Sequence, residues 1–232
     1  MKKTSTLMEQ YALTAFLVLT LLISLAIPLY FSLPQEVVPL MIAIIPAILA
    51  IILTALTVGR KGVGTLLKKL FQWRVGFKWY LVAFGLALVL RLTMSVLALL
   101  FGWIPAIQIR VWSLPEFMII GSFILIGGAM EELGWRGYVL PKLLANRSFL
   151  FSALISGVFW GVLHLGLNLP GQMNAGASWL PTLLQLIGLS LVLSWLFVQT
   201  RGNIVIPILF HTGQNLFVIL NDGITLHSNS GS

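Results

Sequence analysis

GGAMEELGWRG, residues 127–137, places two of the chain's six acidic residues side by side inside a long apolar segment. A carboxylate in such surroundings normally faces a charged partner or a water-filled cavity, because a low dielectric penalises its charge. On a helix, Glu132 and Arg136 are four residues apart and share a face, so they can pair. Glu131 then points about 100° away from that pair. We interpret Glu131 as a reactive carboxylate and the pair as its support.

The composition around this stretch is typical of a membrane protein. Hydrophobic residues make up 59% of the 232 residues and charged residues only 9%, and apolar runs of about 20 residues recur. The predicted fold class is all-α, a polytopic membrane helix bundle of about seven transmembrane helices. The predicted spans cover residues 11–32, 37–58, 79–103, 116–140, 149–167, 180–199 and 204–221.

We expect three regions along the chain. Residues 1–115 form N-terminal transmembrane helices, residues 116–221 a catalytic transmembrane core, and residues 222–232 a short polar tail. The longest polar connection, residues 59–78, carries six basic residues interleaved with apolar ones. It is either an amphipathic segment lying on anionic membrane lipids or a solvated basic loop.

The distribution of basic residues predicts the orientation. With the N-terminus in the cytoplasm, most of the 14 basic residues lie on the inner side, where the positive-inside rule places them. The net charge of +8 is thus explained by an anionic inner leaflet, without a nucleic-acid partner. We predict an integral membrane protein of a bacterial plasma membrane, with a cytoplasmic N-terminus. The sequence indicates no particular oligomeric state.

Two further polar sites lie inside predicted spans. His164 ends the run SGVFWGVLH with Trp160 one turn before it, and His211 and Asn215 share a helix face in PILFHTGQN. A single histidine in a membrane helix is often only a hydrogen-bonding residue between helices. Here, however, the polar residues gather in the fourth, fifth and seventh spans, so we predict one shared site among these three spans.

Such a set of side chains supports hydrolysis. A buried carboxylate can take a proton from water as general base and return it to a leaving amine. Histidine can orient that water or bind a metal, and an asparagine with a second imidazole can donate hydrogen bonds to an oxyanion. The chain has no cysteine, no H-E-x-x-H and no G-x-S-x-G motif, so thiol, zincin and serine-elbow chemistries are excluded.

These motifs, in this order, resemble those of the CPBP family of intramembrane endopeptidases, named for CAAX-protein and bacteriocin processing and also called the Abi family. The family motifs are E-E-x-x-x-R, an aromatic residue followed by histidine four positions later, and H-x-x-x-N. The second has Trp here where Phe is commoner. The resemblance covers about residues 131–215, and its matching residues are Glu131, Glu132, Arg136, Trp160, His164, His211 and Asn215.

The resemblance implies cleavage of a peptide bond in a CAAX-type lipidated protein or in a bacteriocin- or leader-type peptide. By motif position, Glu131 would be the catalytic base and His164 its partner on the water. His211 and Asn215 would complete the site or stabilise the oxyanion. Zinc is one cofactor such a metalloprotease could use, with Glu131, His164 and His211 as ligands. A metal-free, glutamate-activated water fits the same residues.

Two other functions fit the same polar cluster. One is a non-catalytic membrane binding protein, such as a bacteriocin self-immunity factor. The other is a small transporter with Glu131 as a proton-coupling carboxylate, although the sequence has no inverted repeat. Straight helices would place His164 in the outer half of the membrane and both Glu131 and His211 in the inner half. Convergence therefore requires a tilt, a late start to the fifth span, or a break in a helix.

Overall fold

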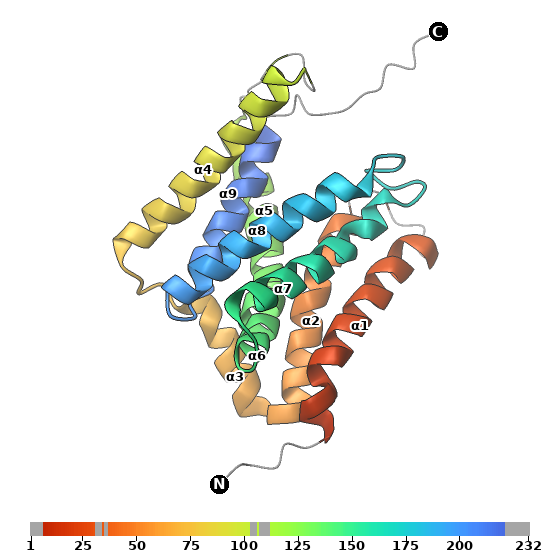
Figure 1. The fold of residues 1–232 in the computed structure, drawn as a ribbon, viewed down its shortest axis with the longest axis vertical. Helices are drawn as coiled ribbons and strands as arrows, with labels where there is room; N and C mark the ends of the chain where they lie inside the picture. Colours follow the sequence, from red (N-terminus) through yellow and green to blue (C-terminus); the bar gives the residue numbers. More distant parts are fainter. Residues whose placement is uncertain (1–6, 31–33, 35–36, 103–105, 107–111, 221–232) are drawn as a thin grey trace.

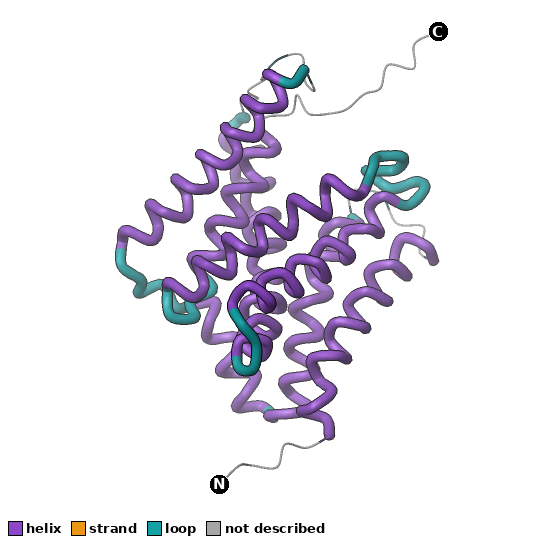
Figure 2. The backbone as a smooth tube through the Cα atoms, viewed as in Figure 1, coloured by secondary structure: helices purple, strands orange, loops and turns teal. Residues whose placement is uncertain are grey.

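The computed structural model describes residues 7–30, 34, 37–102, 106 and 112–220, and within them every regular element is a helix (Figures 1 and 2). The predicted all-α fold class is confirmed. The elements are α1 (Leu7–Tyr30), α2 (Val38–Val58), α3 (Arg60–Lys68), a 3-10 turn η1 (Lys69–Phe71), α4 (Phe77–Leu100), α5 (Leu114–Gly134), a π-helical turn η2 (Trp135–Val139), α6 (Leu140–Leu144), α7 (Phe149–Leu163), a 3-10 turn η3 (His164–Asn168), α8 (Trp179–Gln199) and α9 (Val205–Leu220).

Six of the predicted spans have counterparts that are long and apolar enough to cross a membrane. In the described part of the chain these are Tyr11–Tyr30, Val38–Val58, Phe77–Leu100, Leu114–Leu144, Phe149–Asn168 and Trp179–Gln199. The seventh prediction, residues 204–221, corresponds to α9, which has 16 residues. At 1.5 Å per residue the described part of α9 is about 24 Å long, compared with roughly 30 Å for the hydrocarbon core. The fold is therefore a polytopic bundle of six candidate spans with α9 packed among them.

The helices form two groups that cross (Figure 1). One group is a row in which α1 packs on α2, α2 on α5, α5 on α9, and α9 on α4. The second is the α7–α8 pair, which runs obliquely across α5 and α9 in Figure 1. In the same view α3, the α6–α7 turn and the α8–α9 turn lie toward one end of the bundle, and the α7–α8 loop lies toward the other. The predicted inner loops thus share an end.

Side-chain caps begin the helices that carry the predicted site residues. Ser113 and Glu116 form a capping box at the start of α5, and the Ser148 hydroxyl accepts a hydrogen bond from the Phe151 amide at the start of α7. The Asn203 side chain accepts one from the Ile206 amide at the start of α9, at 3.1 Å. Each cap satisfies an amide that would otherwise lack a partner in the first helical turn, so these helices begin at defined residues.

The basic segment 59–78 begins as an amphipathic helix. On α3, Leu66 is buried against the core while Lys61 and Lys68 are exposed. α3 also packs on α2. Of the two interpretations of this segment, the structure favours the amphipathic one over a solvated loop, and its contact with anionic lipid stays a prediction.

The close crossing of α2 and α5 depends on Gly134. A Cβ at this position would lie 2.7 Å from the Pro46 carbonyl carbon and would also overlap Pro46 Cβ. Both atoms are rigid, so neither can move aside cheaply. We expect Gly134→Ala to destabilise the protein by about 1–3 kcal/mol through overpacking, measured as a lower thermal midpoint of the detergent-solubilised protein. Gly188→Ala is the matched control, because its added Cβ would meet nothing within 4 Å. Equal midpoints for the two variants would contradict the close-packing argument.

Candidate active site

Glu131 lies in the last turn of α5 and is 6% exposed. Its Oε2 accepts a hydrogen bond from the indole Nε1 of Trp160 on α7. Because an indole N–H can only donate, this contact holds one carboxylate oxygen in a fixed direction. The other oxygen remains for a second partner.

Glu132 sits at the centre of a buried polar network. Its Oε1 accepts a hydrogen bond from Arg136 Nη1 at 3.1 Å and lies 3.0 Å from His211 Nδ1 on α9. Arg136 Nη2 donates to the Ser190 hydroxyl of α8 at 3.0 Å, and Ser190 in turn donates to the Ala153 carbonyl of α7 at 2.9 Å. The predicted pairing of Glu132 with Arg136 is present, and through it α5, α7, α8 and α9 are joined.

The chain widens into a π-helical turn directly after the glutamates, from Trp135 to Val139. Such turns are rare and often occur at functional sites. The Lys69 ammonium donates to the Gly137 carbonyl inside this turn at 2.7 Å, and burial lowers the pKa of Lys69. This contact stabilises the π-helical turn that contains Arg136. The i, i+4 spacing in the sequence does not predict such a contact.

His164 lies where α7 ends and the 3-10 turn η3 begins. Its Nδ1 lies 2.8 Å from the Trp160 carbonyl. With the proton on Nδ1, this nitrogen donates to the carbonyl and Nε2 is left as an acceptor. The α7–α8 pair runs obliquely in Figure 1, and His164 and Glu131 line the same two cavities. Of the three ways in which the residues could converge, the tilt is the one present before His164, because α7 begins at Phe149 as predicted and continues unbroken to Leu163.

Trp160 contacts more of the site than its predicted supporting role required. Its ring makes edge-on contacts with His164 and His211, at centroid distances of 5.9 Å and 5.2 Å. The Arg136 guanidinium lies over it at 5.1 Å. Together with its hydrogen bond to Glu131, this places the indole at the centre of the cluster.

Two cavities meet at these side chains. A cavity of about 630 Å³ between α2 and α5 has a mostly apolar lining that includes Ile42, Phe123, Glu131, His164 and Asn215. A smaller cavity of about 100 Å³ is more polar, and it is lined by Glu131, Trp160, His164, Gln185, Leu186, Leu189, His211, Gln214 and Asn215. The structure thus brings all four predicted catalytic residues around one space. Their chemical roles stay predictions.

The three candidate zinc ligands each have a hydrogen-bond contact within the protein. Glu131 Oε2 is held by Trp160, and His211 Nδ1 faces Glu132. Within the described residues, no three side chains of His, Asp or Glu are placed to hold a metal ion. These hydrogen bonds do not use Oε1 of Glu131 or Nε2 of either histidine, so zinc binding by the three residues stays a prediction.

The contribution of α8 to the site was not predicted from the sequence. Ser190 is fully buried in the network, and Gln185 lines the smaller cavity. On α9, Gln214 is buried and donates to the Ala87 carbonyl of α4 at 2.9 Å. The available signal was a polar residue inside an apolar span, which normally faces the bundle interior. The site therefore involves α8 in addition to the fourth, fifth and seventh predicted spans.

Comparison with known proteins points to the same part of the chain. The family described as "Type II CAAX prenyl endopeptidase Rce1-like" matches residues 111–217. The chain is 25% identical over 118 residues to the "CAAX prenyl protease 2" of Methanococcus maripaludis, covering 46% of this chain and 44% of the relative. It is 26% identical over 108 residues to the "Putative membrane peptidase YdiL" of Bacillus subtilis, covering 47% of this chain and 38% of that protein. The resemblance to the CPBP family is confirmed.

The matched segment contains α5 to α8 and α9 as far as residue 217, and therefore every residue of the candidate site. The alignments span less than half the length of each of the two relatives. The chain is an integral membrane protein, as its six apolar helices indicate. The bacterial origin, the cytoplasmic N-terminus and the boundary at residue 115 stay predictions.

Because the ion pair is buried, we expect the stability of the fold to depend on Arg136. Arg136→Met would leave the Glu132 carboxylate buried without its cation, and breaking such a pair costs about 3–5 kcal/mol. We expect a large fall in the thermal midpoint. Arg60→Met is the control, because it removes the same charge from an exposed position at the start of α3. Similar midpoints for the two variants would show that the network does not hold the fold.

Proposed function

We propose that this protein is an intramembrane endopeptidase that hydrolyses a peptide bond in a membrane-associated protein or peptide. The observation that carries the proposal is Glu131, a buried carboxylate with one oxygen held by Trp160, on a cavity shared with His164 and Asn215. It lies in the segment that matches the type II CAAX prenyl endopeptidase family. A carboxylate that is held by one oxygen and lines a cavity suits a general base.

In the proposed reaction, Glu131 takes a proton from a water molecule that also donates to Nε2 of His164. The water oxygen attacks the substrate carbonyl carbon, and the negative charge moves to the carbonyl oxygen. The Asn215 amide can donate to that oxygen. His211 can do so through Nε2 when it is doubly protonated, since its Nδ1 faces Glu132. Glu131 then gives its proton to the leaving amine as the carbon–nitrogen bond breaks. The proposed mechanism uses no metal.

The larger cavity suits the proposed class of substrate. Ten of its thirteen lining residues are apolar or glycine, and the polar three are Glu131, His164 and Asn215. An apolar space beside a hydrolytic site can take the apolar side chains of a membrane-associated peptide or a lipid attached near the scissile bond. We therefore propose a lipidated CAAX-type protein or a leader-type peptide as substrate.

The decisive experiment compares wild type with Glu131→Gln, which keeps the shape of the side chain and removes its basicity. Peptide termini in membranes that express each protein are measured by mass spectrometry. We expect termini that occur only with wild type and a loss of at least about a hundredfold in the variant, the scale of general-base catalysis. The sequences of these termini would identify the substrate class.

Both proteins must accumulate equally and show the same thermal midpoint. Identical termini from wild type and variant in the native host would contradict the protease proposal and favour a binding or immunity role for the same cavity. Repeating the wild-type measurement with a chelator tests the metal-free mechanism. Cleavage that stops and returns when zinc is added would contradict it.

Two variants of Trp160 distinguish the contribution of its ring contacts from that of its hydrogen bond to Glu131. Trp160→Phe keeps an aromatic ring between the two imidazoles but removes the donor to Glu131. We expect a folded protein whose cleavage rate falls about tenfold, because a hydrogen bond to a charged group contributes about 1.5 kcal/mol or more. Trp160→Ala removes the ring as well and should lower both rate and thermal midpoint much further. Equal rates for wild type and Trp160→Phe would show that the hydrogen bond does not position the base.

A further inference from the structure

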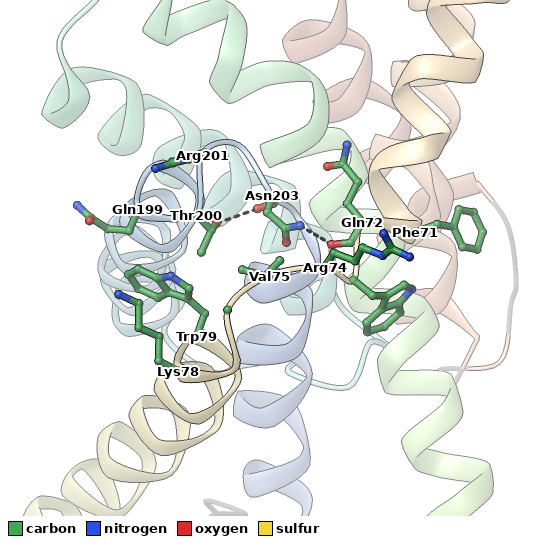
Figure 3. A pocket seen from close by; sticks show the side chains of 12 residues that line it. Phe71, Gln72, Arg74, Val75, Lys78, Trp79, Gln199, Thr200, Arg201 and Asn203 are labelled. Atoms are coloured by element: carbon green, nitrogen blue, oxygen red, sulfur yellow. Dashed lines mark hydrogen bonds between the residues drawn. The ribbon is translucent and has the colours of Figure 1, made fainter.

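A third cavity, of about 1060 Å³, lies away from the candidate active site (Figure 3). Two segments distant in the sequence form it: residues 71–79, which link η1 to α4, and residues 199–203, which link α8 to α9. Arg74, Lys78 and Arg201 contribute positive charge to its lining. None of the lining residues, all within the described part of the chain, is acidic. The cavity therefore carries an uncompensated positive potential.

The backbone of Arg201 is unusual. Its φ is 56°, the left-handed region, which a side chain with a Cβ rarely adopts. Glycine would fit this turn position with less strain, and the next residue, Gly202, also has a positive φ. An arginine at such a position indicates that the charged side chain is used, since the backbone alone would favour glycine.

The start of α4 adds to the positive character of the same cavity. Gly76 is the N-cap of this 24-residue helix, and no side chain of the described residues caps it. Gly76, Lys78 and Trp79 all line the cavity. The free amides and the helix dipole at such an end favour an anion, and here they act together with three cationic side chains.

The aromatic side chains at the cavity indicate that the anion belongs to a membrane surface. Phe71 is 74% exposed and Trp73 is 50% exposed. The Lys78 ammonium lies over the Trp79 ring at 5.3 Å, and Figure 3 shows these two side chains next to each other. Exposed aromatic rings beside basic residues are typical of the level at which lipid headgroups lie. A site for a soluble anion would not need such rings.

We propose that this cavity binds the phosphate of an anionic phospholipid headgroup. Figure 3 shows Arg74 on one side of the cavity and Lys78 and Arg201 on the other, so the three charges attract the phosphate through their combined potential and do not surround it at contact distance. Phe71 and Trp73 lie along the acyl chains.

The cavity adjoins the start of the helix that carries His211 and Asn215. The Asn203 side chain donates through Nδ2 to the backbone carbonyl of Gln72 at 2.6 Å. Its Oδ1 accepts a hydrogen bond from the backbone amide of Ile206 and so caps α9. Figure 3 shows Asn203 between Thr200 and Gln72. A headgroup in this cavity therefore bridges the two segments at the point where α9 begins.

The test compares two triple variants that lose the same charge. The first is Arg74→Gln, Lys78→Gln and Arg201→Gln. The control is Arg60→Gln, Lys61→Gln and Lys68→Gln, exposed residues of α3 that do not line this cavity. Each purified protein is titrated with phosphatidylglycerol or with phosphatidylcholine, and bound lipid is counted by native mass spectrometry. We expect wild type and control to retain one phosphatidylglycerol in preference to phosphatidylcholine, and the first variant to bind it about tenfold more weakly or worse.

Several outcomes would overturn the proposal. These are equal binding of the two lipids by wild type, equal losses in both triple variants, or saturable binding of inorganic phosphate without any preference for phosphatidylglycerol. The single variant Arg201→Gly excludes a purely structural role for this arginine. It relieves the strained φ, so its thermal midpoint without lipid should match or exceed that of wild type, while its affinity for phosphatidylglycerol falls several-fold. A lower midpoint with unchanged lipid affinity would assign Arg201 to the fold instead.

Discussion

The ion pair between Glu132 and Arg136 is fully buried on both sides, and four helices depend on it. Glu132 on α5 also faces His211 on α9, and Arg136 reaches Ser190 on α8, which donates to the backbone of α7. A buried pair of this kind adds little net stability compared with two apolar residues, but it is costly to leave half made. The pair therefore restricts how the helices can pack, because only an arrangement that pairs both charges is tolerated. The arrangement of the active-site helices follows from that requirement.

Trp160 explains how one carboxylate of the doublet can be reactive while its neighbour is structural. The two glutamates are adjacent, so helix geometry directs them to different faces. Glu132 meets a cation and an imidazole, whereas Glu131 meets the indole N–H, which is a neutral donor. The commoner phenylalanine of the family motif has no such donor. In this chain the indole therefore takes on a task that the motif alone does not reveal, which is to fix the direction of the proposed base.

Residue spacing in the sequence predicted the features that depend on a single helix. It did not predict the features that depend on packing between helices. The pairing of Glu132 with Arg136 and the apolar spans follow from periodicity and composition. The π-helical turn, its bond to Lys69 and the role of Ser190 depend on contacts between segments far apart in the sequence. Straight helices separated His164 from Glu131 in depth because the oblique course of α7 is not encoded in the length of a span. The resemblance left zinc and a metal-free water open as alternatives, and residue types alone do not specify that His211 Nδ1 faces Glu132.

The two cavities at the candidate site suggest how hydrolysis can proceed inside a membrane. The smaller one, about 100 Å³, is lined by glutamine, histidine and asparagine side chains and has room for a few water molecules. The larger one is mostly apolar and suits a membrane-associated substrate. Glu131, His164 and Asn215 line both. A base at this boundary can draw its water from the polar side and direct it at a bond on the apolar side. The same position keeps the charged carboxylate away from lipid, because its contacts are with protein and with the polar cavity.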